Sequence, residues 1–162
     1  MRRPSTTNTP FASLCGALLA LSVAASASGQ VPASPLKIRS IAEVESRSKL
    51  IPADRVVPGD RVIYTLEVRN TGATALDAPT VTHPVPEHMR YVADSAVGPG
   101  AEVSYSVDGG RSFERAENLT VQGPDGRLRP AVAADYTDIR WQLKNSLKAN
   151  SVAFVRFRAL VK

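Results

Sequence analysis

Residues 57–72 constrain the fold of this chain more than any other stretch. A Pro58-Gly59 pair leads into a run in which apolar and polar side chains alternate, and Asn70-Thr71-Gly72 ends it. A period of two with turn residues at both ends predicts a half-buried β-strand. The predicted inward row is Val62, Tyr64, Leu66 and Val68, and the predicted outward row is Ile63, Thr65, Glu67 and Arg69. Such rows are typical of an antiparallel sheet with one face in water.

Further strands are predicted along the chain, at spacings of about ten residues. They are expected at 36–45 (an edge strand), 75–82 (an edge strand or a bulge at Pro79), 89–92, 103–107, 112–114, 136–143 and 151–161, with a possible strand at 119–121. Residues 50–55 are interpreted as a connection, and residues 83–86 as an extended loop because of their two prolines. No long helical pattern occurs. The sequence therefore predicts an all-β fold, an immunoglobulin-like Greek-key β-sandwich of about seven or eight strands.

The first 27 residues are typical of a secretory signal peptide. Basic residues at the start precede an apolar segment without acidic residues at 11–23, and the small residues Ala25 and Ala27 suit a cleavage site. We expect cleavage after Ala27. An uncleaved anchor is the alternative, but the apolar segment is too short for a membrane span. The protein is thus expected to be exported, to the periplasm or out of the cell.

The signal peptide is expected to lead into a flexible segment at residues 28–35 and a single β-sandwich domain at residues 36–162. The only cysteine, Cys15, lies within the predicted signal peptide. The domain then has no disulfide and no thiolate metal site, and its apolar core must stabilise it. The formal net charge is +5, and it falls to +3 when Arg2 and Arg3 are removed with the signal peptide. A charge of this size is not typical of a nucleic-acid-binding protein.

The turns and strands of the domain resemble those of a known family. The turn Pro58-Gly59-Asp60 precedes a Val-x-Tyr-x-Leu-x-Val strand, Asn70-Thr71-Gly72 follows it, and a strand containing Trp141 comes before the final apolar strand. Over roughly residues 38–162 this resembles the bacterial conserved repeat family called domain of unknown function 11. The resemblance implies an immunoglobulin-like module of secreted and cell-surface proteins, with no particular chemistry. The chain departs from the family at His83, where Asp is usual, and in holding one copy rather than a tandem array.

Several residues are expected to have structural roles. Residues 106–113 fit the Asp-box pattern S-x-D-x-G-x-[ST]-[WF], in which the Asp side chain accepts hydrogen bonds from backbone N–H groups of its own hairpin. The Asp-box pattern predicts structural roles for Asp108 and Gly110. The turn at residues 70–72 predicts structural roles for Asn70 and Gly72. Trp141, the only tryptophan, is expected between the two sheets rather than on a sugar-binding surface.

Two histidines offer the one candidate metal site. His83 and His88, with Glu87 beside the second, can supply ligands for zinc or copper if the loop folds back on itself. The prolines of this loop hold the two rings apart, however, and the predicted mature chain has no further nitrogen or sulfur ligand of this kind. No cofactor is predicted. The usual catalytic motifs, such as a G-x-S-x-G elbow or a phosphate loop, are absent, so the protein is predicted not to be an enzyme.

Partner binding is therefore the leading functional hypothesis. The sequence predicts a non-enzymatic exported module that contacts an envelope or surface protein through a loop end or a free edge strand, with no nucleic acid partner and no transmembrane segment after signal cleavage. A periplasmic metal-binding protein is the alternative. If the first and last strands pair, they also place a basic stripe on one face, suited to lipopolysaccharide or another anionic partner. That stripe would contain Lys37, Arg39, Arg156 and Arg158.

Overall fold

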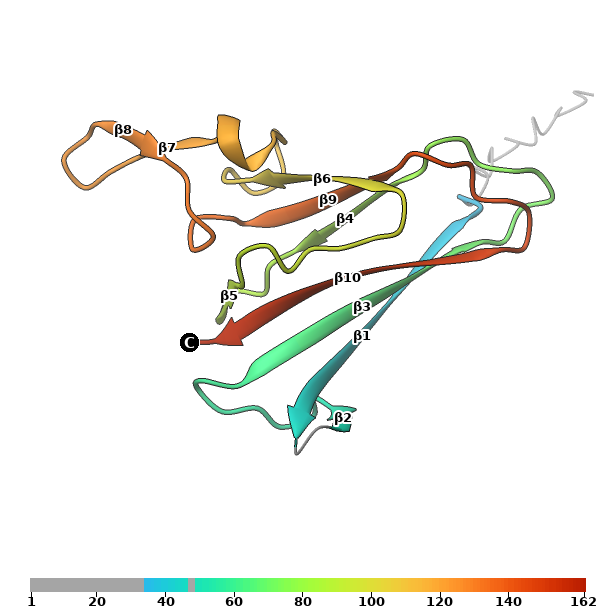
Figure 1. Cartoon of the computed structure of the whole chain (residues 1–162), viewed down its shortest axis with the longest axis horizontal. Helices are drawn as coiled ribbons and strands as arrows, with labels where there is room; N and C mark the ends of the chain where they lie inside the picture. Colours follow the sequence, from blue (N-terminus) through green and yellow to red (C-terminus); the bar gives the residue numbers. More distant parts are fainter. Residues whose placement is uncertain (1–33, 47–48) are drawn as a thin grey trace, which may run out of the picture. The chain divides into compact units, whose positions relative to one another are not determined.

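The computed structural model describes residues 34–46 and 49–162. The predicted signal peptide, residues 1–27, and all but the last two residues of the predicted flexible segment lie outside the described residues. Within the described part the chain forms antiparallel β-sheets, and one 3-10 turn at Ala116–Asn118 is its only helical element. The prediction of an all-β sandwich is confirmed (Figure 1).

The larger sheet has five strands in the order β2-β1-β3-β10-β5. Their bounds are Leu36–Ser46 (β1), Lys49–Pro52 (β2), Arg61–Asn70 (β3), Met89–Tyr91 (β5) and Val152–Val161 (β10). The strand predicted most clearly from the alternating pattern, β3, lies at the centre and pairs with β1 on one side and with β10 on the other. Both the first and the last long strand of the domain are therefore held by the same neighbour.

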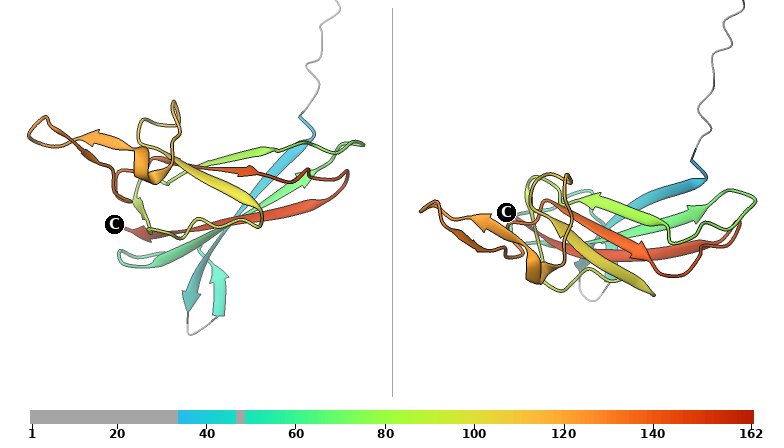
Figure 2. Two further views of the ribbon diagram at one scale, coloured as in Figure 1. Left: turned by 45° about the horizontal axis from the view of Figure 1, so that its top comes forward. Right: turned by 90° about the horizontal axis from the view of Figure 1, so that it is seen from above.

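The smaller sheet has three strands in the order β4-β9-β6. Their bounds are Thr80–Pro84 (β4), Ala101–Ser106 (β6) and Asp138–Leu143 (β9), and a separate hairpin pairs β7 (Thr120–Gln122) with β8 (Leu128–Pro130). Strands distant in the chain are neighbours in both sheets, as in a Greek-key arrangement. The β7–β8 hairpin extends from one end of the sandwich in Figure 1 and in both views of Figure 2.

The core lies between the two sheets and is built around aromatic rings. Trp141 on β9 and Phe157 on β10 are both fully buried, with ring centroids 6.0 Å apart. Tyr64 on β3 stacks on Phe157 at 4.9 Å, and Tyr91 on β5 lies 5.4 Å from Tyr105 on β6. Because aromatic side chains bury large apolar areas, this cluster supplies much of the stabilisation that the domain obtains from its core.

The same contacts show which strands face each other. His83 on β4 lies 5.7 Å from Tyr64 and 5.4 Å from Phe157, so β4 lies over β3 and β10. The Trp141 contact places β9 over β10, and the Tyr91 contact places β6 over β5. The three-stranded sheet therefore ends over β3 and does not extend over β1 and β2.

Two predictions of loops are wrong. The sequence predicts a connection at residues 50–55, but Lys49–Pro52 form β2 and cover one end of β1, which is therefore an edge strand only in part. The sequence also predicts a loop at His83 and Pro84, yet they pair with Ile139 and Asp138 at the end of β4. An edge strand tolerates proline, because half of its N–H groups have no neighbour to bond.

The outward row of β3 also differs from the expectation. Ile63 is predicted to lie in water with Glu67 and Arg69, but it is only 5% exposed, between Glu43 on β1 and Arg158 on β10. The two neighbouring side chains, Glu43 and Arg158, have aliphatic stems that can cover an apolar side chain on an otherwise polar face. The inward row follows the prediction, with Val62, Leu66 and Val68 fully buried.

Candidate functional site

The two sides of β1 differ in their pairing. One side pairs with β3 along nearly the whole strand, from Leu36 opposite Asn70 to Val44 opposite Val62. On the other side only residues 43–46 have a partner, which is β2. Residues 36–42 therefore form an open edge, because on this side no strand among the residues that the structure describes pairs with them. We call this segment the open edge of β1.

Two hydrogen bonds show which backbone groups of the open edge face outward. The Ala42 carbonyl accepts a hydrogen bond from the Ala53 N–H at 3.0 Å on the β2 side, and the Pro35 carbonyl accepts one from the Thr71 N–H at 2.8 Å on the β3 side. Backbone groups alternate between the two sides of a strand from one residue to the next. Ile38 and Ser40 therefore direct their N–H and C=O groups out of the sheet, where another strand can bind them.

The side chains of the open edge have different chemistry on its two faces. Toward the core side, Ile38 is 45% exposed because the smaller sheet does not reach over β1, and Ile51 on β2 is exposed to the same extent. Toward the outer side, Lys37 and Arg39 are both exposed. The open edge thus combines free backbone groups with the apolar side chain of Ile38 on one face and the basic side chains of Lys37 and Arg39 on the other.

The two candidate metal ligands lie in different surroundings. His83 is half-buried at the end of β4 among aromatic rings, and its Nδ1 lies 2.7 Å from the Pro84 carbonyl oxygen. Burial lowers the pKa of His83. His88 is exposed in the connection to β5. Within residues 34–46 and 49–162, no group of three or more His, Cys, Asp or Glu side chains is placed to hold a metal ion. A metal site at His83 and His88 stays a prediction.

Asn70 connects two loops at one end of the sandwich. Its side chain is fully buried, and Nδ2 donates hydrogen bonds to the carbonyls of Thr74 (2.8 Å), Leu147 (2.9 Å) and Lys148 (3.2 Å). Its Oδ1 accepts a hydrogen bond from the Gly72 N–H at 2.9 Å. A Cβ at Gly72 would lie 3.0 Å from the Pro35 Cβ, so any other residue in this turn would need Pro35 to shift.

Asp108 organises the hairpin after β6. Its Oδ1 accepts hydrogen bonds from the backbone N–H groups of Arg111 and Ser112, each at 3.0 Å, and from the Ser106 hydroxyl at 2.7 Å. Its Oδ2 accepts one from the Ser112 hydroxyl at 2.6 Å. Gly110 has φ of 80°, a conformation that side chains disfavour. The Phe113 ring of the motif lies under the guanidinium of Arg140 on β9. The side chains of the motif thus stabilise the hairpin and its contact with the neighbouring strand.

Replacing Asp108 with asparagine is expected to change how stability depends on pH. Hydrogen bonds from the Ser112 side chain and backbone and from the Ser106 side chain hold the pKa of Asp108 well below its usual range. A carboxyl with a lowered folded-state pKa stabilises the fold fully above its unfolded pKa of about 4, and loses this contribution as the pH falls toward the folded value. The unfolding temperature of Asp108→Asn should thus lie below that of the wild type at pH 7 and approach it toward pH ~2.

Thermal unfolding followed by circular dichroism at a series of pH values checks this prediction. Asp77→Asn is the matched control, because Asp77 is an exposed turn residue. The control should follow the wild type across the whole range. A wild-type advantage over Asp108→Asn that stays constant down to pH ~2 would contradict the role assigned to the carboxylate.

The predicted basic stripe does not form, because the first and last strands do not pair. β3 lies between β1 and β10, and its Glu67 stands opposite Arg39 on one side and Phe154 on the other. Glu67 also forms an ion pair with Arg69 at 2.7 Å. The β3 side chains Thr65, Glu67 and Arg69 thus lie between Lys37 and Arg39 on β1 and Arg156 and Arg158 on β10.

Comparisons with known proteins add no family to these observations. No family model matches the chain, and no curated protein matches it. The resemblance to domain of unknown function 11 therefore stays a prediction from the motifs. In the part of the chain that the structure describes, no helix has the length and apolar character needed to cross a membrane.

Proposed function

We propose that this domain is a non-enzymatic module of the cell envelope or the cell exterior that binds an extended segment of another protein by strand addition. The observation that carries the proposal is the open edge of β1, where residues 36–42 pair with β3 on one side and with no strand of the described residues on the other. An added strand would accept and donate hydrogen bonds at Ile38 and Ser40. Backbone bonds of this kind provide affinity, and the alternating side chains provide specificity.

The two rows of the open edge define the partner's chemistry. Side chains of an added strand that point to the core side would lie beside Ile38 and cover it, so they should be apolar. Side chains that point to the outer side would lie beside Lys37 and Arg39, so they should be acidic. The proposed partner is therefore an extended segment in which apolar and acidic residues alternate.

Ser40→Pro is expected to abolish binding of such a segment while the domain stays folded. Proline removes the N–H that Ser40 directs out of the sheet, and leaves the ladder between β1 and β3 intact. A synthetic peptide with alternating valine and glutamate is the probe, and a valine and lysine peptide of the same length is its control. Titration followed by NMR should shift the Ile38 and Ser40 amides of the wild type with the first peptide, and not with the second.

A charge reversal tests the outer row separately. The double variant Lys37→Glu and Arg39→Glu should bind the lysine peptide and lose the glutamate peptide, because the side chains beside the outer row of the added strand change sign. The thermal unfolding temperature of each variant reports whether the domain is folded. Equal binding of the glutamate peptide by the wild type and a folded Ser40→Pro variant would disprove strand addition at this edge.

A further inference from the structure

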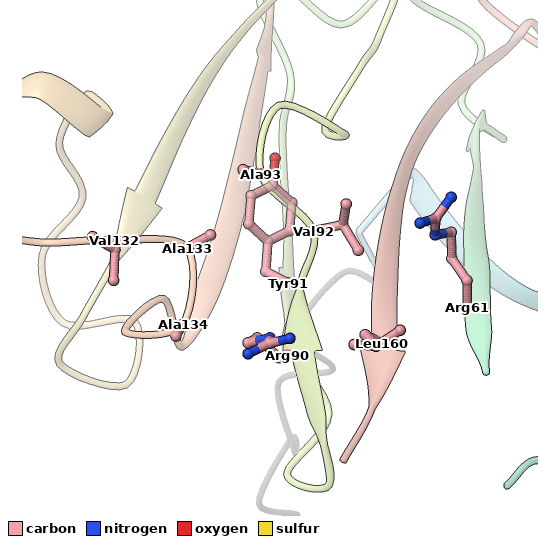
Figure 3. A pocket seen from close by; sticks show the side chains of 9 residues that line it. All are labelled: Arg61, Arg90, Tyr91, Val92, Ala93, Val132, Ala133, Ala134 and Leu160. Atoms are coloured by element: carbon pink, nitrogen blue, oxygen red, sulfur yellow. The ribbon is translucent and has the colours of Figure 1, made fainter. Parts of the chain in front are cut away.

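A hollow of about 430 Å³ lies beside β5. β5 is the edge strand of the larger sheet on the side away from β1 and β2. In the view of Figure 3, residues 90–93 lie between residues 132–134 on one side and Leu160 and Arg61 on the other. The volume of the hollow is within the range of small-molecule sites. Figure 3 shows the residues that line it, which are Arg61, Arg90, Tyr91, Val92, Ala93, Val132, Ala133, Ala134 and Leu160.

Two arginines stand on opposite sides of one leucine in this hollow. Leu160 on β10 pairs with Arg61 on β3 and with Arg90 on β5, so the three side chains form one row on the outer face. Figure 3 shows Arg61 and Arg90 on either side of Leu160. Neighbouring strands lie about 4.8 Å apart, which places the two arginines about two strand spacings from each other. Side chains as long as those of arginine can reach a common anion across this span.

No carboxylate compensates these two charges within the hollow. None of its lining residues is acidic. The four ion pairs found among the described residues involve Arg69, Arg115, Arg127 and Arg129, and neither Arg61 nor Arg90 takes part in one. Two guanidinium groups so placed favour a ligand with two negative charges.

The other walls of the hollow are apolar. Val92 and Ala93 come directly after β5, and residues 132–134 supply a valine and two alanines from the opposite loop. Val132 is 54% exposed, so apolar surface is available to a ligand there. The hollow thus joins a positively charged part to an apolar part. A simple inorganic anion would occupy only the charged part.

We propose that this hollow binds a phosphate monoester attached to an apolar group. A phosphate monoester carries a charge of about −1.5 to −2 at pH 7, which matches the two guanidinium groups. Arginine binds phosphate oxygens through two parallel N–H donors, and a carboxylate offers only one charge for two such partners. A soluble molecule and a lipid headgroup are the two sources of such an ester, since both present the same chemistry to Arg61 and Arg90. The site is independent of the open edge of β1.

The test uses the whole domain and two probes of defined chemistry. Phenyl phosphate represents the soluble source, and phosphatidylcholine vesicles containing phosphatidic acid represent the lipid source. Titration of the wild type with phenyl phosphate should be saturable and should shift the Ala133 and Leu160 methyl signals. The double variant Arg61→Gln and Arg90→Gln should bind about tenfold more weakly or not at all, because both charge-assisted contacts are lost.

The matched control is Arg127→Gln, which removes one positive charge from the exposed β7–β8 hairpin. It should bind both probes like the wild type. Vesicle binding that the Arg61 and Arg90 substitutions abolish, without a response to phenyl phosphate, would assign the site to a lipid headgroup. Equal binding by the wild type and the double variant, or no binding of either probe by the wild type, would overturn the proposal. Because Ser40→Pro leaves this hollow intact, failure here is distinguishable from failure of strand addition.

Discussion

Replacing Phe157 with alanine is expected to lower the free energy of unfolding by about 3–5 kcal/mol, a change large enough to unfold much of the protein at 37 °C. Phe157 is fully buried at the point where the two sheets meet. Its ring stacks on Tyr64 at 4.9 Å and lies 6.0 Å from Trp141. Alanine would leave a cavity between strands of both sheets, and the rigid aromatic neighbours could not collapse to fill it.

Urea unfolding followed by circular dichroism measures this effect. Phe154→Ala is the control, because Phe154 lies on the same strand but is 52% exposed on the outer face. Its loss should change the free energy of unfolding by about 0.5 kcal/mol or less, as is usual for a surface position. Similar losses for both variants would mean that Phe157 is not at the centre of the core.

Replacing Asn70 with alanine is expected to lower the free energy of unfolding by about 3 kcal/mol, since each orphaned buried acceptor costs about 1–3 kcal/mol. The substitution removes the donor to the Leu147 carbonyl, and two further carbonyls lose their hydrogen bonds from the same amide. The loop after β3 and the loop before β10 then lose the side chain that holds them together. We expect faster amide hydrogen exchange around Leu147 as the local sign of this loss.

Asn70→Asp separates hydrogen bonding from packing in the same experiment. Aspartate has nearly the same shape as asparagine, but its carboxylate cannot donate to the three carbonyls and would lie against their oxygens. It should destabilise at least as much as alanine at pH 7. Asn145→Ala, at an exposed position in a nearby loop, should have little effect. A stable Asn70→Asp variant would show that the amide donors are not what holds these loops.

The sequence predicts those parts of the fold in which the residue pattern of a single strand shows which of its faces meets the core. The alternation of apolar and polar residues in β3, β9 and β10 indicates which side chains face the core, because one face of each strand meets the core and the other does not. The hairpin at residues 108–110 is predictable for a similar reason, since a few adjacent residues determine a turn. These elements include the central strand of each main sheet.

The open edge of β1 and the hollow beside β5 depend instead on which strands, distant in the chain, lie beside each other. β2 is too short to show a period, so nothing in Lys49–Pro52 indicates that it covers one end of β1 and leaves the rest open. The pairing of Arg61 and Arg90 with Leu160 joins three strands far apart in the chain. A single sequence shows neither register nor strand order, and the hollow could not be predicted from it.

Trp141 gives the domain an intrinsic optical probe. It is the only tryptophan of the chain and is fully shielded from water, and its Nε1 has no hydrogen-bond partner among the described residues. An indole in such dry surroundings emits at short wavelength and is out of reach of dissolved quenchers, whereas an unfolded chain exposes it. The open edge of β1 lies outside the area covered by the smaller sheet, to which Trp141 belongs. Emission wavelength therefore separates loss of the fold from occupancy of that edge in unlabelled protein.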